Sequence, residues 1–194
     1  GDMKLGEKNK KLIKYILLFL FMVKNTMAYE EAVYEVIQKF ENFEIRLYQE
    51  RYVIQVLYNN EGGGFQKLFN YISGQNQSSQ KIEMTTPVTQ YTSGNQQVMQ
   101  FYLPNRFDQS NAPLPLNNSV EVASISAGYF AVIQYSGFAS DKNFFKHAEI
   151  LKNSLEKENI EFNEPPIKAT YNGPFTLPNL RRNEAMFLIQ WQDK

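Results

Sequence analysis

Histidine and cysteine, two side chains often used in nucleophilic catalysis and in transition-metal sites, are nearly absent from this sequence. His147 is the single histidine and there is no cysteine, which excludes thiolate catalysis, disulfides, zinc fingers, iron–sulfur clusters and sites with several histidines. Ser140 and Asp141 lie close to His147 in the sequence, but a helix N-terminus explains them better than a catalytic triad. His147 itself falls at the border of the apolar face of that helix, a position typical of packing. A hydrolase is therefore the weakest hypothesis.

Two further segments carry charge beside turn-forming residues. The segment "EGGGFQK" (61–67) places Lys67 in the first turn of a predicted helix, and free amides at a helix N-terminus attract anions. The alternative is a flexible glycine loop, and the absence of a Walker pattern argues against nucleotide binding. The run Arg181-Arg182-Asn183-Glu184 fits a polar hairpin turn with weakly paired charges. A structural or binding role for this run also stays open.

The composition predicts one globular domain without an affinity for nucleic acid. The 194 residues are 43% hydrophobic and 14% aromatic, with no net charge. Residues 1–28 contain six lysines against Asp2 and Glu7, so the remainder of the chain is mildly acidic. Because phosphate neutralisation provides most of the affinity for nucleic acids, we expect none to bind.

The first 28 residues resemble a signal for export. A lysine-rich start precedes nine apolar residues (15–23), and Ala28 offers a small residue for cleavage. The run is too short to span a bilayer, which needs about 20 residues, so we expect no membrane span in the mature domain. The segment predicts a periplasmic or secreted protein. An amphipathic helix of a cytoplasmic or membrane-associated protein is the alternative.

The remaining residues, 29–194, predict a single α+β domain with a repeated order of elements. Helical spacing of apolar residues begins at Phe65 and, after a cap at Ser140 or Asp141, again at Phe144. Strands are predicted at 33–38, 43–48, 52–58, 81–91, 97–103, 120–125, 129–137, 167–172 and 185–191. The pseudo-repeats cover about 33–103 and 120–191, joined by a Pro- and Asn-rich linker (104–119). An antiparallel barrel-like sheet with two helices outside it accommodates this order.

One predicted strand contains a proline. The segment "KIEMTTPV" (81–88) alternates as a strand would, but Pro87 is unable to donate a ladder hydrogen bond. We therefore predict that Pro87 lies at a bulge, an edge or a bend.

Three long segments resemble the SOUL family of haem-binding proteins. They are "YEVIQKFENFEIRLY" (34–48), "FQKLFNYISGQNQSSQKIEMTTPVTQY" (65–91) and "YNGPFTLPNLRRNEAMFLIQ" (171–190), in the family's order. The resemblance implies a distorted eight-stranded antiparallel β-barrel with two flanking helices and an internal pseudo-twofold repeat. It also implies binding of haem or another tetrapyrrole, and a fold shared with effector-binding domains of bacterial regulators.

The resemblance also implies where the ligand binds. The family's hydrophobic haem cleft lies beside the first helix, so the expected contacts are Phe65, Lys67, Leu68, Tyr71 and Met84, with Lys67 near a propionate. Some members have a histidine proposed as the axial ligand in the segment "FEIRLY", where this chain has Leu47. We therefore expect apolar contacts to dominate and no catalysis. A binding module for another flat apolar molecule is the alternative.

Overall fold

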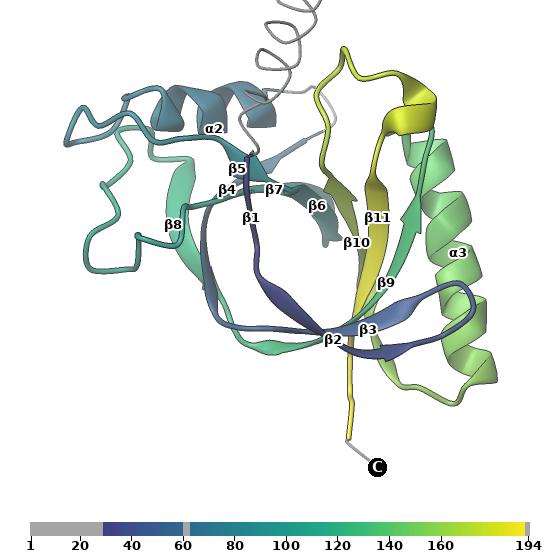
Figure 1. Cartoon of the computed structure of the whole chain (residues 1–194). Helices are drawn as coiled ribbons and strands as arrows, with labels where there is room; N and C mark the ends of the chain where they lie inside the picture. Colours follow the sequence, from purple (N-terminus) through teal and green to yellow (C-terminus); the bar gives the residue numbers. More distant parts are fainter. Residues whose placement is uncertain (1–28, 60–62, 193–194) are drawn as a thin grey trace, which may run out of the picture.

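The computed structural model describes residues 29–59 and 63–192, which form a curled antiparallel sheet and two helices (Figure 1). Nine strands are hydrogen-bonded in the order β2-β3-β9-β11-β10-β6-β7-β4-β8. The export signal predicted for residues 1–28 lies outside the described residues. The strands of the large sheet are β2 (Tyr34–Lys39), β3 (Glu44–Tyr48), β4 (Arg51–Tyr58), β6 (Val88–Ser93), β7 (Gln96–Tyr102), β8 (Val120–Ile125), β9 (Gly128–Tyr135), β10 (Phe162–Thr170) and β11 (Asn183–Ile189).

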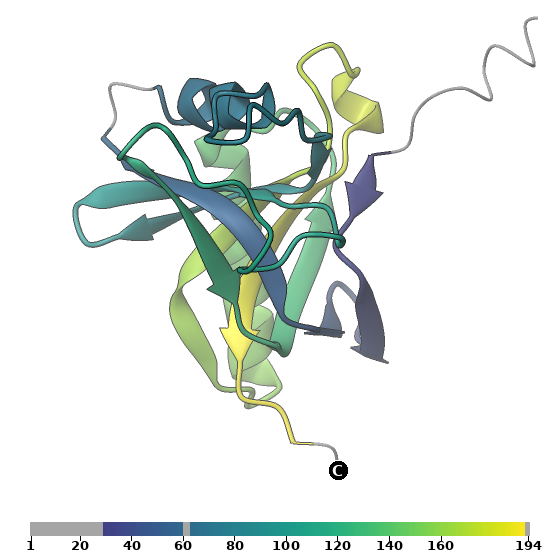
Figure 2. The same ribbon diagram turned by 90° about the vertical axis from the view of Figure 1, so that its left-hand side faces the viewer.

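The prediction of an eight-stranded barrel is wrong in strand number and in closure. The hairpin partner β2 adds a ninth strand beside β3, and β2 and β8 form the two free edges of the sheet. The sheet therefore curls into a half-barrel and stays open, as Figure 2 shows from the side. Two short strands, β1 (Glu30–Glu31) and β5 (Thr85–Thr86), pair in parallel as a separate small sheet.

The second helix, α3 (Asp141–Lys157), begins and packs as its sequence predicts. Ser140 is the N-cap, and its hydroxyl accepts a hydrogen bond from the backbone amide of Asn143. The apolar face is buried against β9, β10 and β11, and its members are Phe144, Ala148, Leu151 and Leu155. As in most protein helices, the stability of α3 comes mainly from the packing of this buried face.

The first helix, α2 (Gly64–Ile72), is short and lies against β4 and β7. Gly64 approaches Tyr58 so closely that a Cβ there would lie 2.9 Å from the Tyr58 ring, which explains a residue without a side chain at this point. After the helix, Gly74 adopts a positive φ of 108°, the left-handed conformation in which glycine commonly ends a helix.

Pro87 lies between two strands, as predicted. The chain leaves the small sheet after Thr86 and enters the large sheet at Val88, and the Thr86–Pro87 peptide is cis. Thr85 fixes this bend by donating its hydroxyl hydrogen to the carbonyl of Tyr102 at 2.6 Å. The predicted strand 81–91 is therefore two strands with a break at the proline.

The sheet order relates the two halves of the chain. The strands β3, β4, β6 and β7 of the first half correspond in turn to β8, β9, β10 and β11 of the second half. When corresponding strands are exchanged, the order of these eight strands is the same, read from the opposite edge of the sheet. Such an order is what a repeated unit of two strands, a helix and two strands would produce. The pair β6–β10 lies at the centre, and each unit places one strand in the other unit's part of the sheet.

Candidate functional site

The structure separates the five predicted contact residues into core and surface. Leu68 and Tyr71 are buried and belong to the apolar cluster beneath α2. Met84, which lies in the segment between α2 and β5, is partly buried and packs against the same cluster. Phe65 is 49% exposed, and Lys67 is partly buried. Direct contact with a ligand is therefore open to Phe65 and Lys67, whereas Leu68 and Tyr71 hold the helix on the sheet.

Tyr71 anchors α2 to the segment that joins the two halves of the chain. Its hydroxyl donates a hydrogen bond to the carbonyl of Pro113 at 2.6 Å. Burial raises the pKa of Tyr71 to about 12 from its ordinary value of 10.0, so the folded protein holds this proton more tightly than the unfolded chain does.

We expect Tyr71→Phe to reduce the fall in the free energy of unfolding between about pH 10 and pH 12. In the wild type the unfolded chain loses this proton from about pH 10, while the folded protein keeps it to about pH 12, so stability falls through that window. Urea unfolding at steps from pH 8 to 12 measures the difference. At neutral pH the variant should lose about 1 kcal/mol with its hydrogen bond. Equal slopes for both proteins would contradict the assignment to Tyr71.

A small hollow opens beside Lys67. It has a volume of about 190 Å³ and lies between α2 and the segment 115–120. Ligand pockets usually measure about 300–1,000 Å³, so a tetrapyrrole does not fit inside this hollow. A ligand at α2 must lie across the outer surface of the helix.

That outer surface carries two stacked aromatic rings. Phe65 and Phe69 have centroids 6.0 Å apart and planes 12° apart, and Phe65 also meets Phe101 edge-on at 5.1 Å. Both rings on the helix are about half exposed. Gly64, Leu68, Tyr71 and Ile72 occupy the sheet-facing side instead, which turns Phe65 and Phe69 outward.

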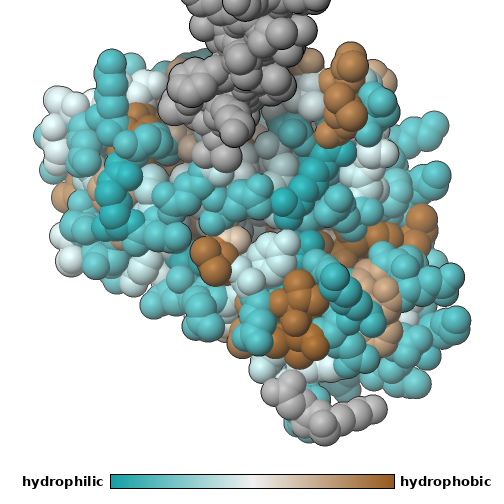
Figure 3. Space-filling view, in the orientation of Figure 1, coloured by the Kyte–Doolittle hydropathy of each residue, from teal (hydrophilic) through white to brown (hydrophobic). Residues whose placement is uncertain are grey.

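A second exposed apolar surface belongs to the loop between β10 and β11. Figures 1 and 2 place this loop, with the 3₁₀ helix η1 (Pro178–Leu180), at the same end of the molecule as α2, and its tip is brown in Figure 3. The exposed apolar residues of the loop are Phe175, Leu177 and Leu180. Phe138, in the segment between β9 and α3, is also exposed and lies under the guanidinium of Arg181 at 5.5 Å. Exposed apolar groups gathered in this way mark binding surfaces.

Hydrogen bonds to its backbone fix the shape of this loop. Arg181 donates to the carbonyls of Thr176 and Pro174, both at 2.8 Å. The amide of Gly137 donates to the carbonyl of Pro178 at 2.8 Å. The loop is thus tied to itself and to the end of β9, which holds its apolar side chains outward.

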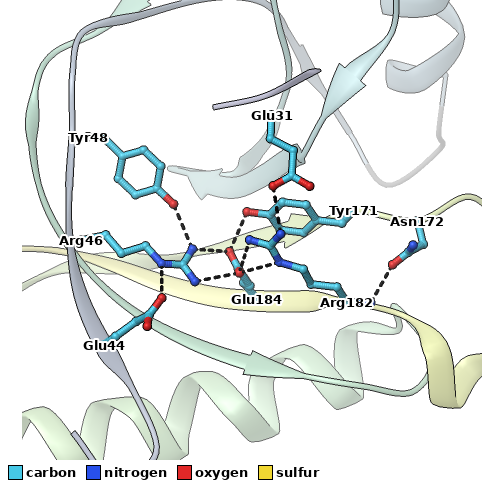
Figure 4. A network of polar contacts seen from close by, with 8 residues as sticks. All are labelled: Glu31, Glu44, Arg46, Tyr48, Tyr171, Asn172, Arg182 and Glu184. Carbon is cyan, nitrogen blue, oxygen red and sulfur yellow. Dashed lines mark hydrogen bonds and ion pairs between the residues drawn. The ribbon is translucent and has the colours of Figure 1, made fainter. Parts of the chain in front are cut away.

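Beneath the loop lies a buried carboxylate with two arginines (Figure 4). Glu184 on β11 is fully buried and accepts two parallel hydrogen bonds from Arg46 on β3, each 3.0 Å long. Arg182 donates to the same carboxylate at 3.0 Å. The interpretation of residues 181–184 as a polar hairpin turn with weakly paired charges does not hold for Glu184, which is buried on β11 and bridges strands on either side of β9. These contacts agree with the structural role that was left open for the run.

Tyrosines complete this cluster on the inner face of the sheet. Tyr171 donates to Glu184 at 2.7 Å, and Tyr48 accepts from Arg46 at 3.1 Å. Burial, reinforced by the negative charge of Glu184, raises the pKa of Tyr171 far above its ordinary value, so the phenol remains a donor. Burial opposes the charge of Arg46, but the hydrogen bond and charge of Glu184 outweigh it and raise the pKa of Arg46.

The remaining sequence candidates are packed residues. His147 stacks on Tyr135 with ring centroids 4.0 Å apart, and its Nδ1 lies 2.8 Å from the carbonyl of Asn143. Leu47 lies on β3 between its partners Glu35 and Tyr129. The packing interpretation of His147 agrees with these contacts.

The described part of the chain has neither a cluster of metal ligands nor a membrane-spanning helix. Residues 29–59 and 63–192 contain no group of three or more His, Cys, Asp or Glu side chains placed to hold a metal ion. No helix within those ranges is long and apolar enough to cross a membrane.

Comparison with known proteins identifies the family. The curled antiparallel sheet with two helices carries a sequence that matches the model of the SOUL heme-binding protein family over residues 29–188. The chain belongs to this family. It is 33% identical to mouse heme-binding protein 2 over 135 residues, which cover 66% of this chain and 64% of that protein. Heme-binding protein 1 of Xenopus tropicalis is 25% identical over 129 residues, 63% of this chain and 67% of that protein.

Solved structures share the fold at low sequence identity. An uncharacterized conserved protein from Listeria innocua has a TM-score of 0.60 at 8% identity, over 77% of this chain and 92% of that one. The C-terminal domain of EcmrR gives 0.55 at 14% identity, over 81% and 98%. A structure described as a hydrolase from Listeria innocua gives 0.57 at 8% identity, over 79% and 94%. At these identities the likeness concerns the fold alone.

Proposed function

We propose that this protein binds haem or a related tetrapyrrole and does so without catalysis. Membership of the SOUL heme-binding protein family carries the proposal, and the matched relatives are named heme-binding proteins. The match spans 64% of mouse heme-binding protein 2, so the activity of that whole protein comes to this chain only as part of the proposal. The export predicted from residues 1–28 stays a proposal beside it.

We place the ligand on the end of the molecule formed by α2 and the loop between β10 and β11. A tetrapyrrole offers a flat apolar face and carboxylates, and the exposed rings of Phe65 and Phe69 offer a matching apolar surface. Lys67 in the first turn of α2 and Arg181 in the loop supply positive charge for the carboxylates. With His147 stacked on Tyr135 and Leu47 on β3, apolar contact provides most of the affinity in this arrangement.

A haemin titration of the full chain tests the function. We expect a shifted Soret band that saturates at one haemin per chain. Absence of a saturable shift would overturn haem binding and favour the alternative, a module for another flat apolar molecule. Competition by metal-free protoporphyrin separates recognition of the macrocycle from recognition of iron.

We expect Lys67→Glu to weaken haemin binding by about tenfold, because it replaces an attractive charge with a repulsive one near the propionates. The Soret titration measures the change. Lys146→Glu makes the same charge reversal on α3 and serves as the control. Equal affinity of the Lys67 variant and the wild type would remove the propionate role of Lys67.

A further inference from the structure

A second recess lies away from α2's aromatic rings, where the start of α3 meets the middle of the sheet. It has a volume of about 380 Å³, within the usual range for small-molecule pockets. Its walls come from the end of β4, the β6–β7 hairpin, the start of α3 and the first part of β10. The residues that define its character are Tyr58, Gln90, Asp141, Phe145, Pro165 and Lys168.

Lys168 gives the recess a buried positive charge. The residue is 9% exposed, and its Nζ lies 2.8 Å from Oδ1 of Asp141. A buried ammonium requires a partner, because the loss of hydration is costly without one. Asp141 provides that partner from a side chain that is 80% exposed.

Asp141 is able to give up this partnership at little cost. A solvated carboxylate loses little when an ion pair opens, and Asp141 lies in the first turn of α3, where the helix N-terminus favours negative charge without Lys168. A carboxylate of a ligand in the recess can therefore replace Asp141 at Lys168.

The other walls are flat and partly apolar. Phe145 is 56% exposed beside the recess, and Pro165 adds a second flat surface. Tyr58 accepts a hydrogen bond from Nε2 of Gln90 at 3.2 Å, so its own O–H is free to donate to a ligand. Burial raises the pKa of Tyr58 above its ordinary value, so the phenol remains a hydrogen-bond donor throughout the neutral range.

We propose that this recess binds a flat aromatic molecule through a carboxylate, which pairs with Lys168 while the ring lies between Phe145 and Pro165. Neither the haem proposal nor the surface at α2 is required for this inference. The carboxylate has two possible sources, a free aromatic acid or a propionate of a tetrapyrrole that reaches the recess. Both present the same chemistry to Lys168.

Calorimetric titration with naphthoate and with its neutral counterpart naphthamide tests the inference on the full chain. We expect naphthoate to bind and Lys168→Met to weaken it by about 10- to 100-fold, the usual worth of a charged hydrogen bond. Asp141→Asn should tighten naphthoate binding several-fold, because the competing carboxylate is gone. Naphthamide should bind weakly and respond to neither substitution.

Two controls guard the result against unfolding and against general charge effects. Lys152→Met removes a lysine whose ion pair with Glu164 is exposed and should leave naphthoate binding unchanged. Phe145→Ser changes an exposed ring, so the fold persists while naphthoate binding weakens. Equal affinity for naphthoate and naphthamide would overturn the inference. So would a result in which neither the Asp141→Asn variant nor the Phe145→Ser variant changes the affinity for naphthoate.

A porphyrin arm identifies the source of the carboxylate. If Lys168→Met also weakens protoporphyrin binding, a propionate enters the recess; if only naphthoate is affected, the natural ligand is a separate aromatic acid. Both outcomes support the site. Failure of haemin to bind at α2 leaves the naphthoate result unaffected, so the two proposals fail separately.

Discussion

Glu184→Gln should lower the free energy of unfolding by about 3–5 kcal/mol, the usual cost of removing one partner of a buried ion pair. The substitution leaves Arg46 charged and 2% exposed, and the partly buried carboxylate of Glu44 is then its one ion-pair partner among the described residues. The amide of glutamine keeps one neutral oxygen for the donors of Arg46, Arg182 and Tyr171, and its NH2 group faces donors instead of accepting from them. Urea unfolding at neutral pH, followed by circular dichroism, measures the loss.

Glu164→Gln is the matched control. Glu164 pairs with Lys152 at 2.9 Å, but both side chains are exposed, so we expect a change below about 1 kcal/mol. A similar small change for Glu184→Gln would show that the buried cluster is not what joins β3 to β11. Because Tyr171 and Arg182 of this cluster flank the loop between β10 and β11, the Glu184 variant should also bind haemin more weakly.

The double substitution Phe65→Ser and Phe69→Ser should reduce haemin affinity by at least about tenfold, because exposed aromatic rings at the centre of a binding surface carry most of its energy. The two rings contribute little to the core, since Leu68, Tyr71 and Ile72 form the buried side of α2. Stability should therefore fall much less than affinity. Soret titration and thermal unfolding of the same samples separate the two effects.

Ile150→Ser provides the comparison on the other helix, since Ile150 is also a partly exposed apolar residue of its helix. We expect it to bind haemin as the wild type does. Unchanged affinity in the Phe65/Phe69 variant, together with a normal fold, would exclude the outer face of α2 as the haem surface and direct attention to the loop at Phe175.

Local signals in the sequence predicted most of the fold. Each of the nine predicted strand ranges overlaps a strand, and the Ser140 cap starts α3. These features depend on residues close together in the chain. Strand β10 starts at Phe162, earlier than predicted, because Pro165 and Pro166 interrupt the strand pattern in the sequence. The register with β11 shifts between Asn163 and Ile167, where these prolines lie.

Features that depend on distant residues were not predictable in the same way. Arg46 and Glu184 meet across 138 residues of sequence, and nothing local to either shows that a charge there is buried. The pattern at α2 predicted a helix and an apolar face, but the choice of Tyr71 for the core and Phe65 for the surface depends on how the helix lies on β4 and β7. The contact between Lys168 and Asp141 likewise requires the packing of α3 on the sheet.

The exchanged strands of the sheet have a consequence for how the chain folds. In the large sheet β3 pairs with β2 and β9, and β8 pairs with β4, so neither half of the sequence completes its own part of the sheet. A nascent first half must wait for the second, which makes the slow step a pairing between distant segments. Two fragments produced by a cut in the linker near Ser110 should each remain incomplete alone and regain structure on mixing.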